Sequence, residues 1–91
     1  MYTCPVCGYG RLEYPPANYS ICPCCATEFD YHDFSFSHAE LRQRWISAGA
    51  QWWDLDTPKP PFWSAEDQLR NIGYELTDSD QMAIAQHQEA A

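Results

Sequence analysis

Positive charge is scarce in this chain. Its 91 residues include five Lys and Arg against 13 Asp and Glu, a formal net charge of −8. The excess of acids lies after residue 25, because Arg11 and Glu13 cancel each other before that point. A negative surface repels phosphate backbones and anionic lipids, so we expect the protein to bind neither nucleic acid nor a membrane. The same charge either attracts a basic partner or serves only to keep the protein in solution.

Long apolar runs are also missing. No stretch approaches the roughly 20 apolar residues that span a bilayer. The first residues, Met-Tyr-Thr-Cys-Pro, have neither the basic nor the apolar region of a signal peptide. We therefore expect a cytoplasmic protein in a compartment that keeps thiols reduced. There, the five cysteines favour metal binding over disulfides.

The sequence patterns of common enzymes do not occur. There is no His-Glu-x-x-His motif, no Gly-rich phosphate loop, and no His-x-Glu paired with Pro-Cys-x-x-Cys. The acidic pairs are most simply solvated surface residues. The sequence therefore predicts a protein that is not an enzyme, with no catalytic residues.

Four of the five cysteines form two Cys-x-x-Cys pairs. They are Cys4, Cys7, Cys22 and Cys25, with 14 residues between the pairs. Two such pairs are typical of Cys₄ zinc sites, in which four thiolates fill every position around the metal. A filled coordination sphere indicates a structural Zn²⁺ site and not a catalytic one. In so small a domain the free energy of zinc binding would also supply much of the free energy of folding.

Cys24 complicates the choice of ligands. When the two pairs are aligned, Cys24 falls at the position of Val6, which predicts a side chain directed away from the metal. The alternative, Cys24 as a ligand in place of Cys25, stays open at this point. As a spare thiol Cys24 is either an inert buried residue or a redox sensor, and no basic neighbour favours the sensor.

The histidines suggest a weaker second possibility. His32 and His38 could bind another metal ion together with Asp30 or Asp33, but surface or helix-capping roles are a simpler interpretation of this spacing. His87 lies in a polar tail.

The chain reads as one small α+β domain, residues 1–91. Residues 1–31 are predicted to be a zinc-ribbon-like, two-knuckle β module, with strands at 10–14, 18–21 and 27–31. Residues 32–76 are predicted to be helical around a Trp- and Pro-rich loop at 51–63, and 77–91 form a C-terminal helix or tail. The tryptophans of the loop should cover the helix and the metal module.

Two short helices have clear boundaries. The first begins at a Ser37–Glu40 capping box, places Leu41, Trp45 and Ala48 on its apolar face, and ends at Gly49. The second begins with Ser64 and Asp67 and ends at Gly73. We expect the ion pairs Glu40–Arg44 and Glu66–Arg70 one helical turn apart.

These motifs together resemble the bacterial cysteine-rich CPCC proteins over roughly residues 3–72. The resemblance implies a fold and a bound metal more than an activity, and Ala26 departs from the glycine expected after the second pair. A more distant likeness is to rubredoxin, in which such cysteine pairs hold iron. The segments that carry the resemblance are Cys4-Pro5-Val6-Cys7-Gly8-Tyr9, Ile21-Cys22-Pro23-Cys24-Cys25, Thr27-Glu28-Phe29-x-Tyr31-x-Asp33, Ser37-His38-x-Glu40-Leu41-Arg42, Trp45-Ile46-x-x-Gly49, Trp52-Trp53, and Trp63 with Gln68-Leu69-Arg70.

Two functions from different classes follow. The first is a non-enzymatic zinc protein that acts as a protein–protein interaction module, with a basic partner, for example a nuclease or toxin. The alternative is a rubredoxin-like protein that transfers electrons through iron. Nucleic-acid binding by a zinc ribbon is disfavoured by the charge.

Overall fold

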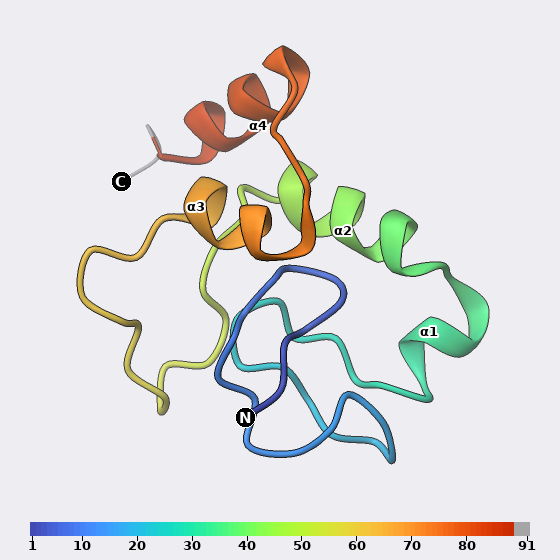
Figure 1. Ribbon diagram of the computed structural model, residues 1–91. Helices are drawn as coiled ribbons and strands as arrows, with labels where there is room; N and C mark the ends of the chain where they lie inside the picture. The colour runs from blue at the N-terminus through green and yellow to red at the C-terminus, as the bar shows by residue number, and fades with distance from the viewer. Residues whose placement is uncertain (89–91) are drawn as a thin grey trace.

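A computed structural model describes residues 1–88. Their regular structure is helical (Figure 1). The first 31 residues and residues 51–63 are loops, and α4 packs on α2 at the end of the molecule opposite the N-terminal loops. None of the helices in this part of the chain is both long and apolar enough to cross a bilayer. The elements are α1 (His32–Ser35), α2 (His38–Ser47), α3 (Ala65–Leu69), the 3-10 turn η1 (Arg70–Ile72) and α4 (Asp78–Gln88).

The prediction of an α+β fold with a β knuckle module is wrong. Residues 1–88 contain no β-strand, and the segments 10–14, 18–21 and 27–31 are loops. The backbone makes two isolated antiparallel bridges, between Tyr2 and Leu12 and between Ile21 and Glu28. Each bridge closes one loop of chain around a cysteine pair, and no second bridge follows to make a ladder.

Backbone conformation explains why no ladder extends. Asn18, Tyr19 and Asp30 have φ angles of 54°, 63° and 67°. This left-handed region turns the chain out of the extended conformation that a strand requires. Pro15 and Pro16, between two of the predicted strands, have no amide hydrogen to donate to a neighbour. An alternation of side chains over four or five residues was therefore insufficient evidence for strands.

The predicted start and end of α2 are confirmed. The Ser37 hydroxyl accepts a hydrogen bond from the Glu40 amide, and the Glu40 carboxylate accepts one from the Ser37 amide, both at 3.0 Å. Gly49 has a φ of 102° at the end of the helix. The predicted apolar face is confirmed in part, since Trp45 is buried and Leu41 half-buried while Ala48 is exposed.

One of the two predicted ion pairs forms. Arg70 lies 4.0 Å from the Glu66 carboxylate. Within residues 1–88 no ion pair joins Glu40 to Arg44, because Glu40 is engaged in the capping box and the guanidinium of Arg44 lies 3.9 Å above the ring of Phe36. α1 lies within the segment 32–76 that was predicted to be helical, but it was not predicted as a separate helix.

The last two helices begin at side-chain caps. Ser64 accepts a hydrogen bond from the amide of Asp67 at the start of α3, as predicted. At the start of α4, Thr77 and Asp80 exchange side-chain to backbone hydrogen bonds of 3.1 Å in both directions. The predicted C-terminal segment is therefore helical from Asp78, and its residues 89–91 lie outside the described residues.

The hydrophobic core lies where the two cysteine loops meet α2 and α3. Val6, Phe29, Ile46 and Leu69 are fully buried there, together with most of the cysteines. Trp52 and Trp63 of the 51–63 loop are half-buried and pack edge to face, with ring centroids 5.9 Å apart. The prediction that the tryptophans are covered fails at Trp53, which is 55% exposed.

Candidate metal centre

Four cysteine sulfurs meet inside this core. The Sγ atoms of Cys4, Cys7, Cys22 and Cys25 all lie within 4.8 Å of one another. Sulfurs of the two loops approach each other to 3.8 Å for Cys4–Cys25 and 3.7 Å for Cys7–Cys22. A tetrahedral zinc ion with metal–sulfur bonds of about 2.3 Å separates its sulfurs by about 3.8 Å. The cysteines that the spacing selects are thus the four that lie together, at distances suited to one metal ion.

The two cysteine loops turn in the same way. The amide of Gly8 donates to the carbonyl of Cys4, and the amide of Ala26 to that of Cys22, both at 2.9 Å. Both residues have a positive φ, 86° for Gly8 and 65° for Ala26. The departure from glycine at position 26 therefore leaves the local turn unchanged, although an alanine in this conformation is strained.

Glycine is required at position 8 for a second reason. A Cβ atom there would collide with the backbone carbonyl of Gln68 in α3. The first loop is therefore packed directly on a helix backbone.

Cys24 is not one of the four. Its side chain is fully buried, and its sulfur accepts a hydrogen bond of 3.2 Å from the side-chain amide of Gln68. The four sulfurs that lie within 4.8 Å of one another include that of Cys25 and not that of Cys24. Gln68 is itself buried, and the same nitrogen donates to the carbonyl of Cys7 at 3.1 Å.

Helical side chains hold the first cysteine loop through four consecutive carbonyls. Arg42 of α2 donates from Nη2 to the carbonyl of residue 5 and from Nε to that of residue 6, both at 2.8 Å. Gln68 donates to the carbonyl of residue 7, and Asn71 to that of residue 8 at 2.9 Å. These bonds place the loop, and hence Cys4 and Cys7, relative to the helices.

The second cysteine loop is held by a different segment. The amides of Trp53 and Asp54 donate to the carbonyls of Cys24 and Pro23, at 3.0 and 2.9 Å. Sequence reasoning missed both sets of contacts. The only available signal was a set of polar residues on or beside the predicted helices, because the bonded partners of Arg42, Gln68 and Asn71 lie 36 to 63 residues away.

Three of the clustered thiols have pKa values displaced from that of a free cysteine. Hydrogen bonding, chiefly with Cys22, raises the pKa of Cys7, and burial adds to this effect. Hydrogen bonding with Cys25 raises the pKa of Cys22. The pKa of Cys25 is lowered by hydrogen bonds from Cys22, then Cys4 and Cys7.

No second metal site assembles from the histidines. Nε2 of His38 lies 3.0 Å from the Asp33 carboxylate, and Nδ1 of His32 accepts a hydrogen bond of 2.8 Å from the Glu28 amide. Among residues 1–88 the cysteine cluster is the one group of three or more Cys, His, Asp or Glu side chains arranged to share an ion.

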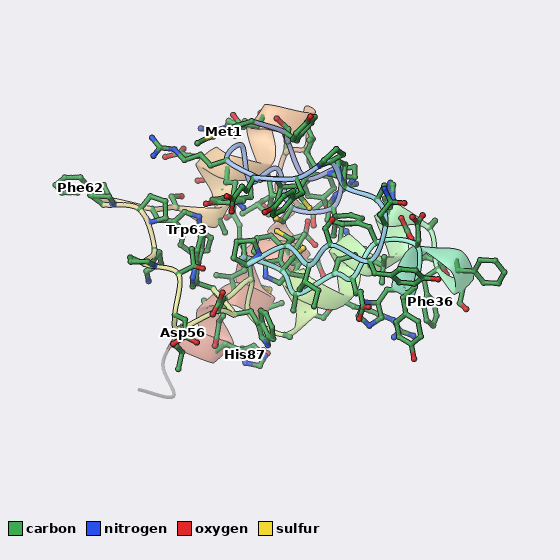
Figure 2. All side chains as sticks on the ribbon, turned by 90° about the horizontal axis from the view of Figure 1, so that it is seen from below. Met1, Phe36, Asp56, Phe62, Trp63 and His87 are labelled. Carbon is green, nitrogen blue, oxygen red and sulfur yellow. The ribbon has the colours of Figure 1, made fainter. Side chains whose placement is uncertain are left out.

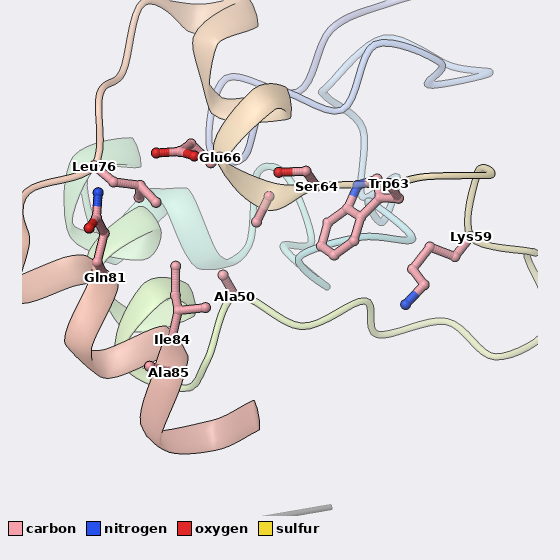
Figure 3. A pocket seen from close by; sticks show the side chains of 10 residues that line it. Ala50, Lys59, Trp63, Ser64, Glu66, Leu76, Gln81, Ile84 and Ala85 are labelled. Atoms are coloured by element: carbon pink, nitrogen blue, oxygen red, sulfur yellow. The ribbon is translucent and has the colours of Figure 1, made fainter. Parts of the chain in front are cut away.

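A cleft of about 490 Å³ opens between α4, the start of α3 and the 51–63 loop (Figure 3). Its apolar lining includes Trp63, Leu76 and Ile84, and the ammonium group of Lys59 lies 5.5 Å from the ring centre of Trp63. Ser64 also lines the cleft, where its hydroxyl caps α3.

Comparison with known proteins gives one finding. A family model described as "Cysteine-rich CPCC" matches residues 2–49, slightly more than half of the chain. The matched region holds both cysteine loops, α1 and α2, whereas Trp53, Gln68 and Asn71 lie beyond it. The search of curated proteins and the search of solved structures gave no match.

Proposed function

The chain belongs to the cysteine-rich CPCC family, and we propose that it is a non-enzymatic protein that binds one structural zinc ion through Cys4, Cys7, Cys22 and Cys25. The observation that carries this proposal is the meeting of four thiols in the core, at separations suited to a tetrahedral ion. Four thiolates leave no position for a substrate. Zinc would thus tie the two cysteine loops together.

The proposal that the protein is not an enzyme rests on the sequence, which carries none of the catalytic motifs considered above. The Ser64 hydroxyl in the candidate cleft is engaged in capping α3, where it accepts the amide hydrogen of Asp67. Five reduced cysteines in one small chain also suit a reducing compartment such as the cytoplasm.

We further propose that the protein acts by binding a basic protein partner. The net charge of −8 supports this choice, because it favours cationic surfaces and opposes nucleic acid. Large apolar side chains stand exposed on the surface, Phe34 and Phe62 most fully among the aromatic ones. Exposed rings of this kind are typical of interaction surfaces when they are clustered.

Metal analysis of the purified protein tests the metal assignment. We expect about one zinc per chain by elemental analysis, a colourless solution, and loss of the metal in Cys4→Ser and Cys22→Ser variants. The alternative function, electron transfer through iron, is favoured by the partial exposure of Cys25, which would give an electron a route to the metal. A red protein with stoichiometric iron would establish this alternative, and a protein without metal would contradict both.

A further inference from the structure

The short helix α1 contributes nothing to the hydrophobic core. It has no buried residue. Phe34 in the helix is 89% exposed, and Tyr31, directly before it, is 62% exposed. Tyr31 precedes the first residue of the helix, and its ring packs edge to face on His32, with ring centroids 5.1 Å apart. Neither ring stabilises this fold by burial, which points to a contact outside the chain.

The two aromatic residues lie in an acidic stretch of the sequence. Residues 28–36 include Glu28, Asp30 and Asp33 but no Lys or Arg. Asp30 accepts a hydrogen bond of 2.6 Å from the Asn18 amide, and Asp33 accepts one of 2.6 Å from the Asp30 amide. Asp33 also contacts Nε2 of His38 at 3.0 Å, whereas Asp30 is exposed and, with about four acceptor positions on its carboxylate, can accept a further donor. We refer to Tyr31, Phe34, Glu28, Asp30 and Asp33 as the α1 patch.

We propose that the α1 patch binds an Arg- or Lys-rich segment of a partner protein, a proposal that rests on the basic partner inferred above. A guanidinium group stacks on an aromatic face while its edge donates to a carboxylate, and the patch offers both groups together. The chain shows such stacking nearby, where Arg44 lies 3.9 Å above the ring of Phe36. Within residues 1–88 no cation lies over Tyr31 or Phe34 in this way.

The patch is connected to the metal centre. Phe29 is fully buried beneath it, and its backbone exchanges hydrogen bonds with Tyr19 and Ser20. The amide of Cys22 also bonds the carbonyl of Thr27, next to Glu28. The segment from Cys25 to α1 is thereby shaped by the second cysteine loop, so we expect metal removal to weaken binding at the patch.

The test measures binding of a defined peptide to the metal-loaded protein. The probe is a labelled peptide of alternating arginine and glycine, and fluorescence anisotropy gives its Kd at low and at physiological salt. A peptide of alternating glutamate and glycine serves as the negative probe. We expect saturable binding of the arginine peptide alone, weakened by added salt.

Two aromatic variants locate the site. Phe34→Ser should raise the Kd about tenfold, by loss of one buried cation–aromatic contact. Phe62→Ser is the matched control, since Phe62 is fully exposed and lies at the opposite end of the molecule from Phe36, which follows α1 (Figure 2). This variant should change the Kd by less than about twofold. Both variants should keep the zinc content and melting temperature of the wild type.

Two variants that each remove one negative charge complete the test. Asp30→Asn retains the oxygen that accepts from Asn18 but removes the charge, and should weaken binding more than Asp56→Asn in the 51–63 loop. Equal losses in the two aromatic variants would overturn the patch while leaving a basic partner possible. If the zinc-loaded wild type does not bind the arginine peptide, the inference is overturned and the metal assignment is unaffected. Self-association abolished by Phe34→Ser would replace the basic segment with a second copy of the chain.

Discussion

The role of Arg42 in the metal centre can be tested by Arg42→Met. Arg42 bonds the carbonyls of Pro5 and Val6 at 2.8 Å, and its guanidinium lies 5.2 Å from the centre of the Tyr74 ring. Hydrogen bonds from charged groups contribute about 1.5–3 kcal/mol each. Methionine retains much of the apolar stem, and Arg42 is only half-buried, so solvent will partly replace the lost donors. We expect a loss of about 3 kcal/mol in the free energy of unfolding.

The same variant should bind metal less tightly. With Arg42 present, the first cysteine loop is held by α2 whether or not metal is bound. The loop therefore loses less conformational entropy when it binds the metal. If half of the lost energy appears in metal binding, the affinity falls by about tenfold. Chemical denaturation of the zinc-loaded protein and competition with a chromophoric chelator measure the two quantities.

Arg44→Met is the matched control for this prediction. Arg44 lies on the same helix and is exposed, where it contacts the ring of Phe36 but neither cysteine loop. Its loss should cost less than about 1 kcal/mol and leave the metal affinity unchanged. Equal effects of the two substitutions would refute the reasoning, because they would show that Arg42 acts only through the general charge or propensity of α2.

Three further results are expected. Cys22→Ser should lose the metal and unfold the N-terminal loops, whereas Cys24→Ser should keep the metal and cost at most about 2 kcal/mol, as elemental analysis and thermal denaturation would show. Gly8→Ala should lower the free energy of unfolding by about 2–4 kcal/mol, because its Cβ atom would collide with a backbone carbonyl of α3. Ala26→Gly should change the free energy of unfolding by less than about 1 kcal/mol. Similar losses in the two variants, measured by chemical denaturation, would contradict the packing described. The pKa values of Cys7 and Cys22 are raised, so metal binding must release protons from these thiols. Chelator competition between about pH 6 and pH 8 should therefore show a metal affinity that rises at least about tenfold per pH unit. A metal affinity that does not change with pH would contradict this.

The boundaries of the helices were predictable because their signals are local. Ser37 and Glu40 satisfy each other's backbone groups within one turn, and Ser64 does the same for α3. Gly49 and Gly73 adopt the positive φ that ends a helix at little cost. The Glu40–Arg44 pair failed although its spacing is favourable, because Phe36, outside the helix, offered the guanidinium another contact.

The strands were predicted wrongly for a related reason. Alternation of polar and apolar side chains indicates which residues face a core. A strand also needs a neighbouring segment to which its backbone can hydrogen-bond over several residues. Around the cysteines each loop has one bridge only, and left-handed residues such as Asp30 redirect the chain after it. The chain can remain irregular there, since burial is organised around the four cysteine sulfurs.

The sequence alone determined which cysteines come together, because two residues between the members of a pair suffice to aim both sulfurs at one point. Cys24 was set apart from Cys25 by the same local argument. Only the tertiary structure decided what holds the two cysteine loops. Arg42, Gln68 and Asn71 reach backbone carbonyls far away in the sequence, and carbonyls are common to all residues. Because every residue has a backbone carbonyl, the sequence does not show which carbonyl a side chain will bond. The packing of the helices decides these contacts.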